Sequence, residues 1–363
     1  MPNPLLTVPW EECVLQPRRD AALEGFVKRE TGMPSPMTPY LAGCPWLVRA
    51  MVRLSFDHGL LVRLSSELAE LIALVVSQEH SCRFCYAVSR AMMRIHGMSE
   101  SRVEELEGKL GGAGLEPRQS AALAFARRMA RSAPLVGAED RERLLAAGFS
   151  RDECREIAFA VSFVAFANRV ATIPAIPPEG LEKLPDRWLT RLMRPLIART
   201  LAAHAARGKP TPLAAPPQGP HAQLIRAFEG SPIAPALAQV LDEAWASPIL
   251  TRRCKALLFA VVAQALDCRL AAAAIEPVLI AEGLAPGEIA QSLSHLDAPA
   301  LTPVERTLLG FARETVWYQP AAIQRRARAV RRQLSAEQFL EAVGVVALAN
   351  AMCRLGAAVV EDP

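Results

Sequence analysis

The chain has 363 residues, of which 51% are hydrophobic and 21% are charged, so it can bury a sizeable core and is not globally disordered. Its 41 basic and 37 acidic residues leave a net charge of +4, which is too small to indicate a nucleic-acid-binding protein. At about 150 residues per domain this length suggests two domains. Aromatic residues make up only 6%, which favours helices over a β-sandwich or barrel.

We expect a soluble, cytoplasmic protein that has no membrane span. No apolar run reaches the ~20 residues that cross a bilayer, and the best run lies around Ile157–Ala167. The first residues, MPNPLLTVPWEEC, contain no basic region followed by an apolar stretch, so we expect no secretory signal. Eight cysteines in a chain of this length do not indicate a disulfide scaffold but reduced thiols.

Apolar residues recur with helical spacing through the first half of the chain. The first apolar stripe consists of Leu68, Leu71, Ile72, Val75 and Val76. It predicts a helix that ends near residues 77–81, and Ser81, a preferred N-cap residue, then begins a second helix with Cys82 in its first turn. Another helix follows Ser150, with Glu153 three residues on in a capping-box pattern. Strand-like alternation is absent, so the predicted fold class is all-α, with a small multi-helix bundle in each half.

The sequence repeats at an offset of 186 residues. Leu71–Arg83 aligns with Leu257–Arg269 with six of thirteen residues identical, and Leu115–Arg127 aligns with Leu301–Arg313. An offset of 185 then pairs Ser150, Glu156 and Arg169 with Ser335, Glu341 and Arg354. We interpret these blocks as a tandem duplication whose copies pack as an internal pseudo-dimer.

Proline marks the boundary between the two repeats. Residues 174–187 carry four prolines, and Lys209–Pro220 reads KPTPLAAPPQGP, which indicates an exposed linker. The intervening Arg187–Arg207 has the apolar spacing of a helix. We therefore predict a first repeat over residues 1–186, a helix and linker over 187–220, and a second repeat over 221–363.

The motif Cys82-Arg-Phe-Cys85 is the local pattern that points most directly to chemistry. A helix start and the adjacent Arg83 both favour a thiolate, and two cysteines three residues apart can form and reopen a disulfide. If the chain reverses between the two helices, Glu70 lies beside the face that carries Cys85 and Ser89, where a carboxylate can relay a proton. The alternative is a pair of small buried thiols without chemistry. A zinc site is disfavoured because no second Cys/His pair has suitable spacing.

The run from Glu70 through the Cys82–Cys85 motif, closed by Asn168 and Arg169, resembles the carboxymuconolactone decarboxylase/alkyl hydroperoxidase D family in its peroxidase-related branch. The resemblance implies an all-helical, oligomeric protein that needs no metal or organic cofactor and is recycled by an external thiol reductant. It further implies that Cys85 attacks the peroxide, that Cys82 resolves the intermediate, and that Glu70 relays a proton.

The sequence departs from this family at the position four residues after the second cysteine. The family has a histidine there and this chain has Ser89, which cannot act as a base near neutral pH. His80, just before Cys82, is a better candidate replacement than His96, which lies three turns along the helix.

The second repeat has lost more of the motif. It keeps Cys268, but alanine and isoleucine stand at the other positions, namely Ala256 for Glu70, Ala271 for Cys85 and Ile275 for Ser89. We therefore interpret it as a degenerate copy that is retained for packing.

Three functions follow from these patterns. The first is a thiol-disulfide oxidoreductase that acts on a hydrogen or organic peroxide. The second is a lyase or isomerase that acts on a small carboxylated lactone, and the third is a non-catalytic scaffold. The arginine cluster Arg325–Arg332 could bind nucleic acid, but its spacing favours the solvated face of a helix, so no nucleic-acid partner is expected.

Overall fold

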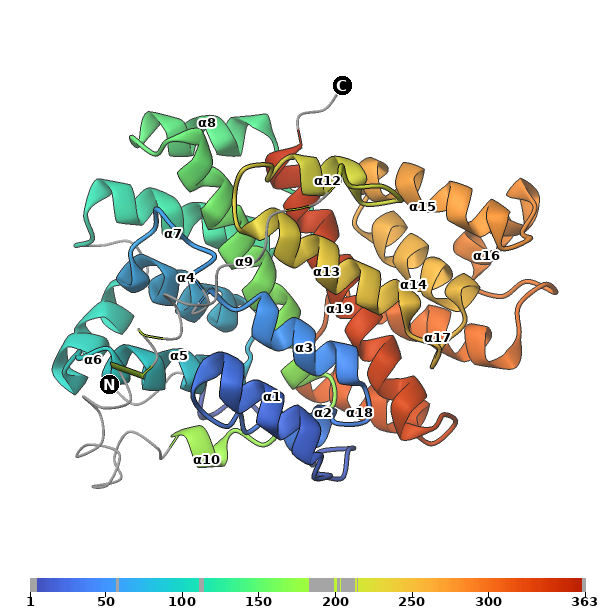
Figure 1. The fold of residues 1–363 in the computed structure, drawn as a ribbon, viewed down its shortest axis with the longest axis horizontal. Helices are drawn as coiled ribbons and strands as arrows, with labels where there is room; N and C mark the ends of the chain where they lie inside the picture. Colours follow the sequence, from blue (N-terminus) through green and yellow to red (C-terminus); the bar gives the residue numbers. More distant parts are fainter. Residues whose placement is uncertain are drawn as a thin grey trace.

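The computed structural model describes residues 5–56, 59–110, 114–182 and 215–360, together with residues 199, 200, 203 and 213. Within these ranges every regular element is a helix, which confirms the predicted all-α class (Figure 1). Most of the predicted helix over residues 187–207 and the first part of the proline-rich linker over residues 209–220 lie outside the described residues. We call α1–α10 the first half and α12–α19 the second half.

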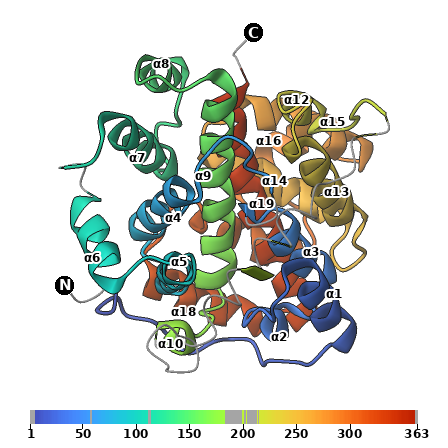
Figure 2. The same cartoon turned by 60° about the vertical axis from the view of Figure 1, so that its left-hand side comes forward.

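The first half begins with three helices that pack on one another, and the third of them, α3, also packs against α13 of the second half (Figure 2). They are α1 (Ala21–Thr31), α2 (Thr38–Leu41) and α3 (Pro45–Arg53). Helix α3 also approaches α19 so closely that a Cβ atom on Gly344 would lie 2.9 Å from the Trp46 ring. Glycine is therefore the residue that lets these two helices meet.

The remaining helices of the first half form a bundle around α9. They are α4 (Ser66–Glu79), α5 (Arg83–Ile95), α6 (Glu100–Lys109), α7 (Pro117–Ala130), α8 (Ala138–Ala146), α9 (Arg151–Thr172) and the short α10 (Glu179–Glu182). The apolar stripe predicted for α4 is buried along its whole length. The capping box of Ser150 and Glu153 begins α9, as predicted.

The second half has a similar order of helices. They are α12 (Ala222–Arg226), α13 (Ile233–Ala246), α14 (Arg252–Ala265), α15 (Arg269–Ala281), α16 (Pro286–His295), α17 (Pro303–Glu314), α18 (Pro320–Arg331) and α19 (Ala336–Val359). Helices α14 to α17 begin 186 residues after α4 to α7, and α19 begins 185 residues after α9. The helix starts therefore follow the offset at which the sequence repeats.

Helices α9 and α19 pack side by side through the middle of the molecule, with α4–α8 on one side and α12–α16 on the other (Figure 2). Each carries one fully buried arginine that reaches the other half. Arg169 donates to the carbonyl oxygens of Thr315 and Val316, at 3.0 Å each. Arg354 donates to the Met129 carbonyl at 2.7 Å and to that of Arg131. Each arginine thus binds the carbonyl oxygens at the end of α7 or α17 in the opposite half.

The expectation that no apolar run is long enough to cross a bilayer needs a correction. Helix α19 has 24 residues and by length and composition could span a membrane, but 89% of its most apolar stretch is buried inside the molecule. Such burial is typical of the core helix of a soluble protein, since α19 packs against α9, α14 and α15.

The arginine cluster near the end of the chain lies on α18. Its apolar stripe, Ile323, Ala327 and Val330, is buried as predicted. Its arginines face other parts of the chain: Arg325 pairs with Glu11 at 3.0 Å and Arg326 with Glu314 at 3.2 Å. The cluster is thus the solvated face of a helix with intramolecular partners.

Candidate functional site

The cysteine motif lies at a tight reversal between α4 and α5, and one expectation about this turn was wrong. Ser81 is not the N-cap of α5, because it has a left-handed backbone (φ 51°) and ends α4. The amide of Cys82 donates to the Ser77 carbonyl at 2.9 Å and that of Ser81 to the Gln78 carbonyl at 3.0 Å, the two bonds of a Schellman motif. Cys82 is therefore itself the N-cap residue, and Cys85 occupies the first turn.

As the N-cap residue, Cys82 presents its sulfur to the start of the helix. Its Sγ accepts the amide hydrogen of Cys85 at 3.4 Å, and the side chain is fully buried. Burial by itself raises the pKa of Cys82, but hydrogen bonds outweigh it and lower that pKa below its usual value. The donors are the Cys85 thiol, the Thr172 hydroxyl and the amides of Cys85 and Phe84. An anion at Cys82 is thus held by the first turn of α5.

Cys85 has the opposite electrostatics. Burial raises its pKa well above the usual value, and its hydrogen bond to Cys82 and the charge there raise it further. Cys82 is therefore the more acidic of the two thiols, and Cys85 is the protonated donor in the hydrogen bond between them. The two thiols differ in access as well, because Cys85 lines a cavity and Cys82 does not.

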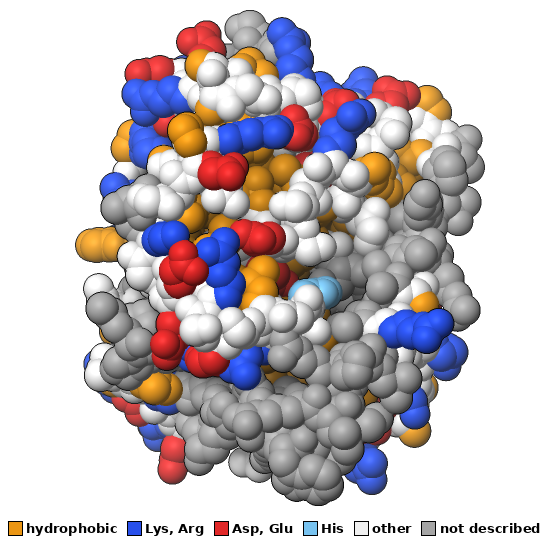
Figure 3. All heavy atoms as spheres, turned by 90° about the vertical axis from the view of Figure 1, so that its left-hand side faces the viewer, with side chains coloured by type: hydrophobic (Ala, Val, Ile, Leu, Met, Phe, Trp, Pro, Cys, Tyr) orange, Lys and Arg blue, Asp and Glu red, His pale blue; other side chains and the backbone are white. Residues whose placement is uncertain are grey.

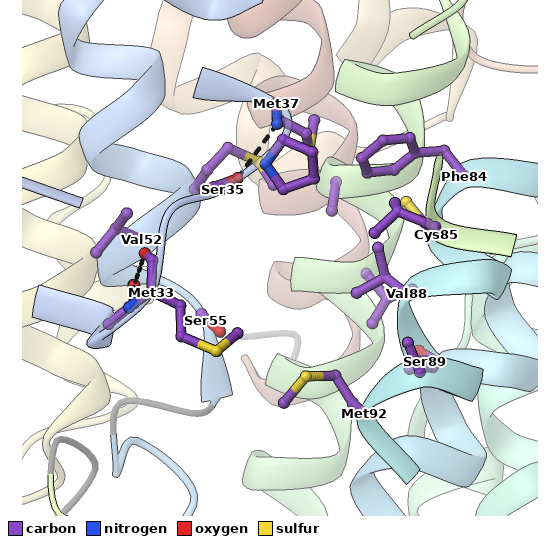
Figure 4. Close-up of a pocket in the computed structure, with 18 of the residues that line it drawn as sticks. Met33, Ser35, Met37, Val52, Ser55, Phe84, Cys85, Val88, Ser89 and Met92 are labelled. Atoms are coloured by element: carbon purple, nitrogen blue, oxygen red, sulfur yellow. Dashed lines mark hydrogen bonds between the residues drawn. The ribbon is translucent and has the colours of Figure 1, made fainter. Parts of the chain in front are cut away.

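The cavity has a volume of about 310 Å³ and lies between α5 and the segment that connects α1 to α2. In Figure 4, Phe84, Cys85, Val88, Ser89 and Met92 form one wall, and Met33, Ser35, Met37, Val52 and Ser55 face them. Most of the lining is apolar, with Phe163 and Val164 of α9 also contributing. The cavity therefore suits a ligand that is largely apolar.

A small polar wall interrupts this apolar lining. Glu70 and Ser77 on α4 and Ser89 on α5 all line the cavity together with Cys85, and all are buried. Glu70, Cys85 and Ser89 therefore open onto the same cavity, and the helices that carry them, α4 and α5, pack against each other. A carboxyl group and a thiol line one cavity, where a proton can pass to or from a bound molecule.

The structure does not give His80 the role of the missing histidine. One ring nitrogen, Nε2, lies 3.0 Å from the Ala130 carbonyl, and Nδ1 lies 3.0 Å from Nδ2 of Asn168. Burial, together with Arg169 and Arg354, lowers its pKa well below the usual value, so the ring is neutral. His80 does not line the cavity. His96 is exposed at the end of α5, so neither histidine replaces the base at Ser89.

Sequence reasoning missed two contributors to the site. Thr172, at the last turn of α9, lies 90 residues from Cys82 in the chain, and no local pattern connects them. The facing wall, residues 33–37, contains no motif, and only the tertiary packing brings it to the cavity. In the sequence, the feature that could have indicated this segment is a pair of methionines beside prolines, which is typical of an irregular apolar segment.

The second half keeps the turn but not the cavity residues. Asp267 has a left-handed backbone (φ 50°), and Cys268 is the N-cap of α15. The Cys268 thiol donates to the Cys353 carbonyl at 3.7 Å, and a hydrogen bond between the two thiols is the main cause that raises the pKa of Cys353. Cys353 occupies the place that Asn168 has in the first half. Its proximity to Cys268 was not expected from the sequence.

Charges on the surface over this bundle are mixed. On the face shown in Figure 3, acidic and basic side chains alternate around small apolar areas. Examples are the pairs Arg127–Glu79 at 2.7 Å and Lys109–Glu105 at 2.5 Å. Among the described residues no group of three or more His, Cys, Asp or Glu side chains could hold a metal ion.

The fold and the site define an all-helical protein with a paired-cysteine turn that opens onto an apolar cavity. Residues 45–128, from α3 to the end of α7, match the model of the carboxymuconolactone decarboxylase family. The matched segment contains Glu70, Cys82 and Cys85. No curated protein and no solved structure shows significant similarity to the chain.

Proposed function

We propose that this protein is a thiol-disulfide oxidoreductase that reduces an organic or hydrogen peroxide with Cys82 and Cys85. The observation that carries the proposal is that Cys85 and Glu70 line the same cavity, while the Cys82 sulfur accepts the amide hydrogen of Cys85 at the start of α5. The activity is consistent with the family match, and it also explains why the two thiols differ in acidity.

The first step in this mechanism passes a proton between the two thiols. Cys85 donates a hydrogen bond to Cys82, so its proton can move to Cys82 and leave a thiolate that faces the cavity. That thiolate attacks the distal oxygen of the hydroperoxide and the O–O bond breaks. Glu70 supplies the proton that converts the leaving alkoxide to an alcohol, and Cys85 becomes a sulfenic acid.

The second step closes the disulfide. The Cys82 sulfur attacks the Cys85 sulfur, the S–O bond breaks, and water leaves with the proton of the Cys82 thiol. An external dithiol then reduces the disulfide and is itself oxidised, which completes the cycle without a metal or organic cofactor. We expect such a reductant in the cytoplasm, the compartment that the reduced cysteines favour.

The experiment that tests this function is a thiol count by mass spectrometry on the native protein, before and after one equivalent of cumene hydroperoxide. We expect Cys82 and Cys85 to be lost together as one linked peptide while the other six cysteines stay reduced. Cys85→Ala should abolish the linked peptide. Oxidation spread evenly over all eight cysteines, or none at all, would reject the proposal.

A second candidate is a lyase or isomerase that acts on a small carboxylated lactone. It is favoured by the name of the matched family and by the carboxyl group of Glu70 in the cavity. Such an enzyme would use Glu70 as acid or base and would not need Cys85. Turnover of a lactone by the Cys85→Ala variant, with loss in Glu70→Gln, would favour this activity over the first.

We infer that the second half is a degenerate copy that serves as a built-in pseudo-dimer partner. Support comes from the helix starts that recur at an offset of 185 or 186, and from Arg169 and Arg354, which bind reciprocal positions in the two halves. Analytical ultracentrifugation tests whether the chain assembles further. A sedimentation coefficient that stays constant with concentration and fits one chain would leave the internal pair as the complete assembly.

A further inference from the structure

The segment that follows α17 in the second half lies against the dithiol turn of the first half. Two of its carbonyl oxygens, on Thr315 and Val316, are bound by Arg169 of α9. The Val316 carbonyl also accepts the Ser132 hydroxyl at 2.7 Å. These bonds fix the backbone immediately before Tyr318 relative to the first half.

The Tyr318 side chain extends along the same face of α9. The Arg169 guanidinium carbon lies 5.7 Å from the centre of the Tyr318 ring, a cation–π distance. Thr172 is three residues beyond Arg169, so both side chains lie on one face of the helix. The hydroxyl oxygens of Tyr318 and Thr172 are both buried, and neither has a hydrogen-bond partner at ordinary distance among the described residues. Two such hydroxyls are costly unless they serve each other or a nearby anion.

The nearby anion is the Cys82 sulfur. The Thr172 hydroxyl is close enough to Cys82 to act as a donor that lowers the pKa of this thiol, and it acts in the same way on Tyr318. The pKa of Tyr318 is raised to about 12, because burial outweighs the lowering by Arg169 and the charge at Cys82 adds to the rise. Tyr318 therefore stays a neutral donor at neutral pH.

We propose that Tyr318, contributed by the second half, is a positioning residue of the dithiol site, whose phenol donates to the Thr172 hydroxyl so that this hydroxyl donates to the Cys82 thiolate. The proposal rests on the dithiol function proposed above and gives the second half a direct part in it. The segment would then be retained because it orients a donor toward a sulfur anion, in addition to covering apolar surface.

Other titratable groups lie around this set of side chains and must be separated from the proposed effect. Cys85 is hydrogen-bonded to Cys82, Arg169 and Arg354 both interact with Tyr318, and His80 interacts with both arginines. His80 is neutral above its strongly lowered pKa, and Arg354, with a pKa of about 9, stays charged below pH 8. Above the pKa of His80 and below pH 8, neither His80 nor Arg354 changes charge, so a shift in the alkylation profile reports on the cysteine pair.

The test is the pH profile of iodoacetamide alkylation of the Cys82–Cys85 peptide in the full-length protein, measured by mass spectrometry. Since a hydrogen bond to a charged group contributes about 1.5 kcal/mol, Tyr318→Phe should slow alkylation at pH 7 about tenfold and move the profile to higher pH. Thr172→Val should do the same, and the double variant should be no slower than Thr172→Val, because both changes break one chain of donors.

Two variants serve as controls. Thr172→Ser keeps the hydroxyl and should retain the wild-type profile, whereas Trp317→Phe changes the exposed neighbour of Tyr318 and should have no effect. An unchanged profile in Tyr318→Phe, with unchanged thermal stability, would overturn the proposal. A wild-type profile with the midpoint of an ordinary thiol would instead overturn the dithiol function itself, so the two failures can be distinguished.

Discussion

Cys82 and Cys268 occupy the same turn in the two halves but different surroundings. Each follows a residue with φ near 50° that ends the preceding helix, and each is the N-cap of the next. Cys82 has Cys85 three residues on and a cavity beyond it, whereas Cys268 has Ala271 at that place and lies against Cys353. Both halves therefore have the same turn structure. Whether the turn can take part in thiol chemistry depends on the residues and the cavity beside it.

The largest expected difference between the two halves comes from replacing one cysteine of each half, Cys85 or Cys268, with alanine. Cys85→Ala should abolish the linked peptide formed with hydroperoxide, because no thiol then faces the cavity. Cys268→Ala should leave the yield of the Cys82–Cys85 linkage unchanged. Peptide mapping after one equivalent of oxidant measures both, and loss of the linkage in Cys268→Ala would show that the two halves share one redox system.

Substitution of the two buried arginines tests whether each half contributes equally to the stability of the other. Arg169→Met and Arg354→Met should each lower the free energy of unfolding by about 4 kcal/mol, because each leaves several buried acceptors in the other half without a donor. Urea denaturation followed by circular dichroism measures the loss. A loss below 1 kcal/mol for one of them would contradict the reciprocal arrangement.

Buried histidines should make both halves sensitive to acid. His221 of the second half lies against Trp245 and Phe259, and burial lowers its pKa from 6.5 to about 4. The folded state holds this ring neutral while the unfolded chain binds a proton below pH 6.5. Stability is therefore complete above pH 6.5 and falls by about 3 kcal/mol by pH 4.

The measurement is the free energy of unfolding of wild type and His221→Phe between pH 7 and pH 4. The variant keeps the ring stack and should lose less stability on acidification. His80→Gln, which preserves a donor and an acceptor, should also flatten the profile, because the pKa of His80 is lowered as well. An acid dependence unchanged in both variants would show that other groups carry it.

The smallest expected effect concerns the matched positions Ser89 and Ile275 of the two halves. Ser89→His places a base on the cavity wall beside Cys85 and should speed its oxidation by hydroperoxide about 100-fold, the lower range for general-base catalysis. Stopped-flow oxidation rates at pH 7 measure the gain, with Cys85→Ala/Ser89→His as the control. A rate equal to wild type would mean that Cys82 already supplies all the activation available.

Much of this architecture could be predicted from the sequence. Helical spacing in α4, the capping box at Ser150 and the repeat at an offset of 186 depend on residues close in the chain or on direct identity, so they are visible without coordinates. The neighbourhood of Glu70 and Cys85 could also be predicted, since a reversal between two consecutive helices fixes which turns face each other.

The details of the turn could not be predicted in the same way. Ser81 is a good N-cap by residue type, yet the Schellman motif at the end of α4 requires it in a left-handed conformation, and the capping position moves to Cys82. The competing requirement came from the preceding helix, whose last carbonyl groups needed donors. His80 was misjudged for a similar reason, because its partners Ala130 and Asn168 are distant in sequence.

By itself, the amino-acid sequence determined that this chain forms helices in two matched sets and that one set carries a paired-cysteine turn, because these properties follow from local spacing. Tertiary structure decided which thiol is the more acidic, which residues form the facing wall of the cavity and which distant side chains reach the sulfur. Those outcomes depend on burial, on the packing of the first turn of α5 and on contacts between residues far apart in the chain, such as Cys82 and Thr172, which are 90 positions apart. Desolvation and hydrogen bonding depend on which groups lie close together in space, and the order of residues along the chain does not give that information.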